Sequence, residues 1–401
     1  MRFLLCLTFS LLTWNLGAQQ PLSTQSFEAG ILMDAASGRI LWSKNPEQEI
    51  IPASLTKMIT LYMAWQAMEE GRFTKNSLFK VPRETSAQAM GPDSSLMFLE
   101  EGMNVSLWDL MQGLAVDSGN DAAETLALMI GGTKANFMGS IDFNLKSLGF
   151  KSLKFYDPAG LDIRSRITAR EYAEFCRIYM GKFPQALKEL HNLKRFTFPS
   201  KKIPGFHTRP ITQFNRNLLV GTYPGVDGLK TGYLPESGYH IATTAIKEQT
   251  RLIALILGVR ERTTDAGTRV RAKAASQLLD WGFKKYELRI LPAPTLPVPR
   301  VFYSTEEYPV VQLKNLPQFV LSAQELSALK VEIRMPLRFE GPLHPDKVLG
   351  EVVYRLQGKE IFSSPITTDK SGDHTPWYIS LWQFFEILFQ NLMGIPAPVK
   401  L

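Results

Sequence analysis

The sequence predicts an α+β protein, in which a domain of helices and antiparallel sheet precedes a small all-β domain and a C-terminal amphipathic helix. Two observations predict the first domain: apolar residues recur at helical spacing, and apolar runs between residues 226 and 259 are separated by turn residues, as in neighbouring strands. The third observation is a change of composition after Phe283, where Pro-rich sequence leads into short β-like runs. The helical stretches lie at 54–70, 107–114, 122–130 and 265–279.

The first eighteen residues have the layout of a secretory signal peptide. A short positive start precedes an apolar run at 3–12 and a small-residue exit at 16–18, so we expect export and cleavage after Ala18. A buried first strand is the alternative. Cleavage would remove Cys6 and leave Cys176 in an apolar stretch, where we interpret it as a buried structural residue rather than a disulfide partner.

The first helical stretch carries a serine and a lysine on one face. Ser54 and Lys57 are three residues apart, and residues at this spacing are neighbours on a helix. Apolar residues lie nearly all round the helix, which indicates burial, and a buried lysine can lose its proton near neutral pH and act as a general base. The alternative is a helix-capping serine followed by a solvent-exposed lysine.

A second polar pair, Ser118 and Asn120, lies on a predicted connector between two helices. Ser106 and Asp109 form a start like a capping box before the first of these helices, and Gly119 breaks the helical pattern. A short connector lets both side chains point into one cleft. Judged alone, the segment is also compatible with an ordinary C-cap glycine and N-cap asparagine.

The third set, Lys230, Thr231 and Gly232, lies on a predicted strand that is followed by turn residues and a partner strand. Lys230 and Gly232 face one way and Thr231 the other, and a glycine lets a substrate backbone approach the strand. A plain edge strand with a surface lysine is the alternative. Single motifs are weak, since S-x-x-K recurs at 327–330 and S-x-N at 43–45, so the inference depends on the order of all three.

In that order, S-L-T-K, S-G-N and K-T-G resemble the motifs of low-molecular-mass penicillin-binding proteins of the D-alanyl-D-alanine carboxypeptidase type. The similarity covers about Phe27 to Phe283 closely and the following region more loosely. It is carried also by the segments 91–99, 118–123, 211–217, 226–232 and 278–283. The resemblance implies a catalytic domain with the penicillin-binding and β-lactamase-like fold.

On the matching positions, the resemblance implies a serine peptidase that removes the terminal D-alanine from peptidoglycan pentapeptide stems without a cofactor. Ser54 would form an acyl-enzyme, Lys57 would take the serine proton, and Ser118 would pass a proton to the departing D-alanine. The implied substrate-binding positions are Asn120 for the substrate amide, Lys230, Thr231, Arg216 and Arg271 for the terminal carboxylate, Gly232 on the strand, and the backbone N–H groups of Ser54 and Tyr233 for the oxyanion.

Two departures bear on the reaction. The middle motif is S-G-N rather than the S-D-N of class A β-lactamases, and no E-x-x-L-N segment is present to supply their deacylating glutamate; 189–193 is the nearest imitation, with different spacing. We therefore expect β-lactam antibiotics to act as covalent inhibitors that are released slowly. Ala159 stands where some members of the family have His, so that position's assistance is not carried over.

Short β-like runs follow the Pro-rich stretch at 291–299 and indicate a small all-β domain, interpreted as a spacer or docking module. The runs lie at 301–303, 310–313, 331–335 and 351–356. The predicted organisation is a signal peptide at 1–18, the peptidase domain at 19–286, the all-β domain at 287–372 and a tail at 373–401.

The tail from Trp377 to Met393 is apolar except for a narrow polar stripe. The stripe consists of Ser380, Gln383, Glu386 and Gln390. This pattern suits a helix that lies in the membrane interface with tryptophans at headgroup level. We therefore expect peripheral anchoring on the periplasmic side of the bacterial cytoplasmic membrane. A helix docked on the β domain is the alternative.

The remaining composition excludes some partners. The formal net charge is +7, which suits a polyanionic wall or membrane surface. The basic stretch at 188–209 is interleaved with Leu, Phe and Pro, so we interpret it as a solvated loop and expect no nucleic-acid partner. The histidines lack metal-ligand spacing, so no metal is expected. Two other functions stay open: endopeptidase cleavage of cross-links by the same site, and a non-turnover scaffold or sensor that binds wall peptide or penicillin.

Overall fold

The computed structural model describes residues 27–314 and 316–401, so the predicted signal peptide lies outside the described residues. The chain forms two compact units, and each is described by itself. The first comprises the described residues up to Lys247 together with Arg251–Gly282. The second comprises Glu248–Thr250 and the described chain from Phe283 onward, including the tail.

A five-stranded sheet forms one layer of the first unit, in the order β2-β1-β9-β8-β7. The pairs β1–β2, β1–β9 and β7–β8 are antiparallel, which confirms the predicted antiparallel sheet. β8 and β9 are buried along most of their length, because both faces of the sheet are covered. The strands are β1 (Ala29–Asp34), β2 (Ile40–Lys44), β7 (Val226–Leu234), β8 (Gly238–Lys247) and β9 (Thr250–Val259).

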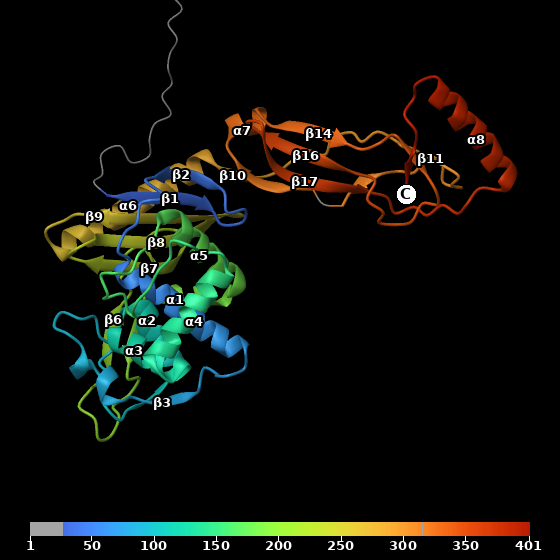
Figure 1. The fold of residues 1–401 in the computed structure, drawn as a ribbon. Coiled ribbons are helices and arrows are strands. Elements are labelled where there is room, and N and C mark those ends of the chain that lie inside the picture. Colours follow the sequence, from blue (N-terminus) through green and yellow to red (C-terminus); the bar gives the residue numbers. More distant parts are fainter. Residues whose placement is uncertain (1–26, 315) are drawn as a thin grey trace, which may run out of the picture. The chain divides into compact units, whose positions relative to one another are not determined.

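Helices cover the two faces of this sheet (Figure 1). α6 (Thr264–Lys285) packs closely on one face, since a Cβ at Gly267 would lie 2.2 Å from the Tyr239 ring. On the other face, side chains such as Ile31 and Leu255 share one core with the helical region. That region contains α1 (Lys57–Glu69), α2 (Leu107–Val116), α3 (Asn120–Gly131), α4 (Lys134–Ser147) and α5 (Ala169–Lys182).

The buried helix predicted from Ser54 onward is confirmed, with one correction at its start. α1 is buried at every residue from Lys57 to Trp65. Ser54, however, lies in the 3-10 turn η1 (Ala53–Thr56) that precedes α1 rather than in an α-helical turn. The predicted cap of α2 is present, because the Ser106 hydroxyl accepts a hydrogen bond from the Asp109 N–H at 3.0 Å.

Cys176 is a buried residue of α5, as expected for a structural thiol. The interpretation of 188–209 as a solvated loop is wrong in part. Its lysines are exposed, but Leu190 and His191 are buried in a π-helical turn and β5 pairs with β6. The smaller elements are β3 (Leu78–Lys80), β4 (Asn104–Ser106), β5 (Arg195–Phe198), β6 (Ile211–Phe214), the 3-10 turns η2 (Arg83–Thr85) and η3 (Ala87–Ala89), and η4 (Leu187–His191).

The second unit is built mainly from strands in small sheets, with the orders β12-β17-β16-β14, β11-β15-β18 and β10-β13. Four of its strands correspond to the predicted β-like runs, namely β11 (Arg300–Phe302), β12 (Gln312–Leu313), β14 (Lys330–Arg334) and β16 (Gly350–Leu356). The other elements are β10 (Glu287–Ile290), β13 (Gln318–Leu321), α7 (Ala323–Ser327), β15 (Arg338–Glu340), β17 (Lys359–Thr367), α8 (Trp377–Leu392) and β18 (Val399–Lys400). Their cores include Leu321, Val352 and Tyr354.

α8 packs on its own unit through the polar stripe predicted from the sequence. The Gln383 side chain accepts a hydrogen bond from the Tyr303 N–H at 2.7 Å, and Arg300 forms an ion pair with Glu386. Most of the apolar residues face outward, with exposed fractions of 77% for Trp377 and 72% for Trp382, whereas Ile387 is buried. In the described part of the chain, no helix has the length and apolarity that a membrane crossing requires.

Candidate active site

Lys57 lies at the centre of the polar residues that the sequence singled out. Its Nζ lies 3.0 Å from Ser54 Oγ, and it donates to Asn120 Oδ1 at 2.7 Å and to the Ala159 carbonyl at 2.6 Å. The side chain is fully buried, and this burial lowers the pKa of Lys57 to about 7. A neutral amine has two N–H groups and one lone pair. Lys57 Nζ donates to Ser54 Oγ in this structure; when the amine is neutral and donates both N–H groups to Asn120 and Ala159, its lone pair is available to the serine hydroxyl.

The Ala159 carbonyl is held in place by a loop that turns around one carboxylate. Asp157 accepts hydrogen bonds from the N–H groups of Ala159 at 2.8 Å and Asp162 at 2.7 Å. Gly160 has a φ of +86°, and a Cβ there would lie 1.9 Å from the Ala53 carbonyl oxygen. The contribution of position 159 to Lys57 is therefore a main-chain carbonyl, which does not depend on whether Ala or His stands there.

Ser118 lies on the predicted connector after α2, whereas Asn120 is already the first residue of α3, which begins two residues earlier than predicted. Ser118 has a φ of +65°, a conformation that costs a non-glycine residue about 1–3 kcal/mol. In the part of the chain that the structure describes, its buried Oγ has no hydrogen-bond partner. Asp121 stabilises the connector by accepting from the Met97 N–H at 2.8 Å. The strain and the free hydroxyl both fit a group held ready for a substrate.

Lys230 and Thr231 are buried on β7, with exposed fractions of 1% and 4%. Burial lowers the pKa of Lys230 well below its usual value, and the positive charges of Lys57, Arg271 and Arg216 lower it further. Lys57, Lys230 and Arg271 are buried and Arg216 is exposed, and a bound anion would relieve the repulsion among these cations. The predicted carboxylate-binding positions therefore lie close enough to one another to interact electrostatically.

Arg271 contributes hydrogen bonds to the fold as well as a positive charge to the site. From α6 it donates to the carbonyls of Gly232 at 2.9 Å and His240 at 3.3 Å, and to that of Arg216 at 3.3 Å. It therefore ties β7, β8 and the segment with Arg216 together. Its burial lowers the pKa of its guanidinium to about 10.

Gly232 allows β7 to lie against the turn that carries Ser54. A Cβ at this position would lie 3.0 Å from the Pro52 carbonyl oxygen and 3.2 Å from the Ser54 nitrogen. Glycine is therefore what allows the two backbones to approach. The two N–H groups predicted to bind the oxyanion, those of Ser54 and Tyr233, therefore belong to two adjacent segments of main chain.

The structure adds two residues that sequence reasoning missed. Asp117 accepts a hydrogen bond from Gln213 at 2.7 Å, and burial raises the pKa of its carboxyl to about 7. His191 contacts the Tyr179 hydroxyl at 2.9 Å and, at 3.3 Å, the carbonyl of Leu229, the residue before Lys230. Asp117 could have been found from the sequence, because it directly precedes Ser118. His191 had none, because its partners are distant in the sequence.

Comparisons with known proteins all point to one family. A family model described as D-alanyl-D-alanine carboxypeptidase matches residues 16–261. D-alanyl-D-alanine carboxypeptidase DacC of Escherichia coli K12 is 30% identical over 94% of this chain and 92% of its own length. D-alanyl-D-alanine carboxypeptidase DacA of Haemophilus influenzae is 32% identical over 91% of this chain and 90% of its own length. The crystal structure of penicillin binding protein 5 from Haemophilus influenzae is 30% identical, with a TM-score of 0.72, over 88% of this chain and 98% of that one. It confirms the predicted fold class.

Proposed function

The chain belongs to the D-alanyl-D-alanine carboxypeptidase family, and we propose that its reaction proceeds through an acyl-enzyme on Ser54. The observation that carries this proposal is the 3.0 Å contact between Ser54 Oγ and Lys57 Nζ. Lys57 is buried, its pKa is lowered to about 7 by burial, and its other contacts leave a lone pair for the serine proton. A hydroxyl nucleophile needs such an adjacent base.

The proposed steps follow from this arrangement. Lys57 takes the proton as Ser54 Oγ forms a bond to the carbonyl carbon between the two terminal D-alanines. Ser118 gives its proton to the leaving amine as the carbon–nitrogen bond breaks and takes the proton held by Lys57, which becomes neutral again. Water then attacks the ester, giving one proton to Lys57, and Ser54 Oγ recovers a proton from Lys57 as it leaves. The N–H groups of Ser54 and Tyr233 would stabilise the oxyanion; loss of one such donor typically costs about 10²–10³ in rate.

The terminal carboxylate of a peptidoglycan stem would bind at Lys230 and Thr231, with the charges of Arg216 and Arg271 nearby. The lowered pKa of Lys230 supports this assignment, since its first cause is burial and the next are neighbouring cations. A carboxylate at this place supplies the missing countercharge. β-Lactam antibiotics carry a carboxylate beside a reactive carbonyl, so we propose that they acylate Ser54 in the same orientation.

The test measures free D-alanine released from a pentapeptide stem, together with labelling by a fluorescent penicillin. Wild type should show both, and Ser54→Ala neither. Ser327→Ala is the matched control, because Ser327 belongs to the second S-x-x-K sequence and lies exposed at the end of α7. Release of D-alanine by Ser54→Ala would refute the assignment. Splitting of cross-linked dimers without release of D-alanine would instead favour the endopeptidase.

We further propose that the protein is exported and that α8 binds the membrane surface. The support is the orientation of the helix: its polar stripe packs on the β domain, while the tryptophans and Phe389 are exposed. Burial of exposed aromatic side chains in the interface would stabilise binding. Neutral vesicles should therefore retain the mature protein, and Trp382→Ser with Phe389→Ser should abolish retention. Phe143→Ser, at an equally exposed position on α4, is the control. Equal retention of both variants would contradict the proposal.

A further inference from the structure

A chain of buried hydrogen bonds runs from α1 to β7 through residues that no step of the proposed reaction uses. Trp65 Nε1 of α1 donates to the Tyr179 hydroxyl of α5 at 3.1 Å. That hydroxyl lies 2.9 Å from Nε2 of His191, and Nδ1 of His191 lies 3.3 Å from the Leu229 carbonyl on β7. All four side chains are buried. The chain of hydrogen bonds thus ends one residue before Lys230, to which the terminal carboxylate of the substrate is assigned.

Only one arrangement of protons satisfies every group in this chain. An indole nitrogen can only donate and a carbonyl oxygen can only accept. The Tyr179 oxygen therefore accepts from Trp65, its own proton goes to His191 Nε2, and Nδ1–H donates to the Leu229 carbonyl. In the other tautomer, Nδ1 would turn a lone pair toward the carbonyl oxygen. Burial lowers the pKa of His191 to about 4, so at neutral pH the imidazole is neutral, with one donor and one acceptor.

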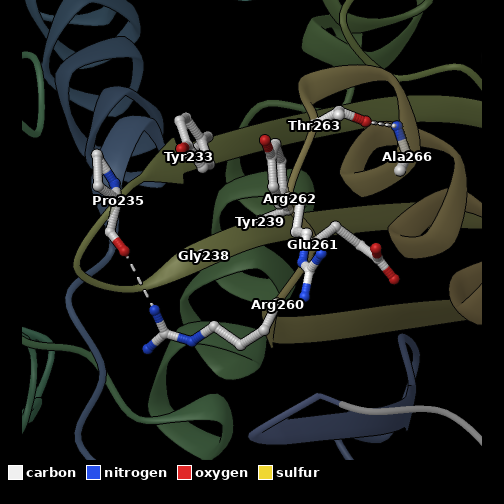
Figure 2. Close-up of a pocket in the computed structure, with 9 residues that line it drawn as sticks. All are labelled: Tyr233, Pro235, Gly238, Tyr239, Arg260, Glu261, Arg262, Thr263 and Ala266. Atoms are coloured by element: carbon white, nitrogen blue, oxygen red, sulfur yellow. Dashed lines mark hydrogen bonds between the residues drawn. The ribbon is translucent and has the colours of Figure 1, made fainter.

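The two ends of β7 are held differently. β7 is the outer strand of its sheet, so β8 is its only neighbour within that sheet. Its C-terminal end leads into the hairpin with β8, where Tyr233 and Tyr239 line a pocket of about 550 Å³ (Figure 2). Its N-terminal half is closely packed: a Cβ at Gly228 would overlap with Cβ of His191, and Thr243 donates to the Gly228 carbonyl at 2.7 Å. The strand is therefore fixed where it meets η4.

His191 is also held through its main chain. The Asn215 side chain donates to the carbonyls of His191 at 3.2 Å and Leu193 at 2.9 Å. Asn215 directly precedes Arg216, a cation assigned to the same carboxylate. The imidazole and its supports thus connect α1, α5 and the segment with Arg216 to one carbonyl of β7. Because His191 is fixed at its main chain and at its ring, it can hold the strand in position.

The position of the Lys230 ammonium depends on the main chain that carries it. Nζ donates to the carbonyl of the next residue, Thr231, at 3.2 Å, and this contact within β7 does not tie the strand to the rest of the site. The positive charges of Lys57 and Arg271 repel the ammonium. A strand that could shift would let the ammonium move away from these cations, and the place of the carboxylate would move with it.

We propose that His191 is a positioning residue of the carboxylate-binding site. Its Nδ1–H fixes the Leu229 carbonyl and, through the main chain, the ammonium of Lys230, while Tyr179 orients the imidazole. The inference rests on the proposed function, because it takes the assignment of the terminal carboxylate as given. It implies that loss of the imidazole contact weakens the recognition of a carboxylate more than the reactivity of Ser54.

The test compares two reagents that acylate Ser54: a penicillin, which carries a carboxylate, and p-nitrophenyl acetate, which carries none. The measured quantity is the ratio of the two second-order rate constants, penicillin over ester, after subtraction of the rate of Ser54→Ala with each reagent. A change that only destabilises the protein would lower both constants together. A displaced ammonium would lower the constant for penicillin more and would reduce the ratio.

Two variants of His191 separate the roles of the two imidazole nitrogens. The amide nitrogen of His191→Asn lies in the place of Nδ1 and can still donate to the Leu229 carbonyl, so this variant should keep most of the wild-type ratio. The amide of His191→Gln reaches the place of Nε2 and leaves that of Nδ1 without a donor. Its ratio should fall about fivefold, the effect typical of one lost hydrogen bond. Urea unfolding of both variants checks that they are folded.

Tyr179→Phe tests the support of the imidazole. Without the hydroxyl, His191 is free to take the other tautomer, so the ratio should fall in this variant too. Tyr62→Phe is the matched control and should keep the wild-type ratio. Tyr62 is a buried tyrosine whose ring packs on the same Phe183 ring as that of Tyr179, but its hydroxyl lies 3.5 Å from Lys182 Nζ.

The outcomes separate this inference from the function on which it rests. Equal ratios in wild type and His191→Gln would refute the positioning role. An equal fall in His191→Asn and His191→Gln would refute it as well, since the bond to the Leu229 carbonyl would then not matter. Undiminished reaction of Ser54→Ala with penicillin would overturn the proposed function itself, and this inference with it.

Discussion

The acylation of Ser54 should follow the protonation state of Lys57. Burial lowers the pKa of Lys57 to about 7, so about half of the protein has the neutral amine at pH 7, but only about 1% has it at pH 5. The second-order rate constant for acylation should therefore rise about 50-fold from pH 5 to pH 7 and flatten above pH 8. Lys57→Arg should lose acylation at every pH, because a guanidinium keeps its proton.

The assay is stopped-flow or gel-based labelling with a fluorescent penicillin between pH 5 and pH 9. Lys330→Arg is the matched control, because Lys330 is the exposed lysine of the second S-x-x-K sequence; it should reproduce the wild-type profile. Loss of a general base typically costs about 10²–10⁴ in rate. A flat profile between pH 5 and pH 8 would show that acylation does not depend on neutral Lys57, and a midpoint near pH 10 would show that burial does not lower the pKa of Lys57; either result would refute the reasoning.

Three further predictions concern the supports of the site. Gly160→Ala should reduce the rate of D-alanine release at least about tenfold, because its Cβ would lie 1.9 Å from the Ala53 carbonyl oxygen. The control Gly149→Ala has the same φ of +86° but open surroundings, so it should cost only about 1 kcal/mol of stability. Equal activity of the two variants would contradict this prediction. Burial lowers the pKa of His191 to about 4, so the folded state stays neutral while the unfolded state binds a proton, and the free energy of unfolding should fall from pH 6.5 to pH 4. Urea titrations of His191→Gln should show a smaller decrease in the free energy of unfolding between pH 6.5 and pH 4. The same pH dependence as in wild type would contradict this role of His191. Burial raises the pKa of Asp117 to about 7, so its carboxyl ionises at lower pH in the unfolded state than in the folded state, and this group should lower the free energy of unfolding as the pH rises from 4 to 7. Asp117→Asn should remove this contribution. A variant with the wild-type pH profile would show that Asp117 does not have the raised pKa.

The helices and strands around the site could be predicted because their local signals agree. The apolar surface of α1 indicates a buried helix, and the Ser106–Asp109 start together with Gly119 marks the connector that carries Ser118. The turn residues after Leu234 mark the end of β7. The spacing of apolar residues predicts which face of a helix or strand is buried. For these elements, that prediction was enough to assign each motif to a helix, a connector or a strand.

The tail shows where periodicity stops being informative. The sequence indicated one polar and one apolar face for α8, and it left open which face would pack on the protein. The structure answers this with Arg300, which pairs with Glu386 from a strand far away in the sequence. This half-buried ion pair and the Tyr303–Gln383 hydrogen bond hold the polar stripe inward. The apolar face is left exposed as a consequence.

By itself, the sequence was enough to propose a nucleophile, a base and a cationic clamp, because three ordered motifs on a buried helix, a connector and a strand together indicate one chemistry. The tertiary structure alone decided what makes the base work: the Ala159 carbonyl and Asn120 reach Lys57 from more than sixty residues away. The physical reason is that a lowered pKa comes from desolvation and from the partners that surround an amine. Neither quantity is encoded in local spacing, since both arise only when distant segments pack together.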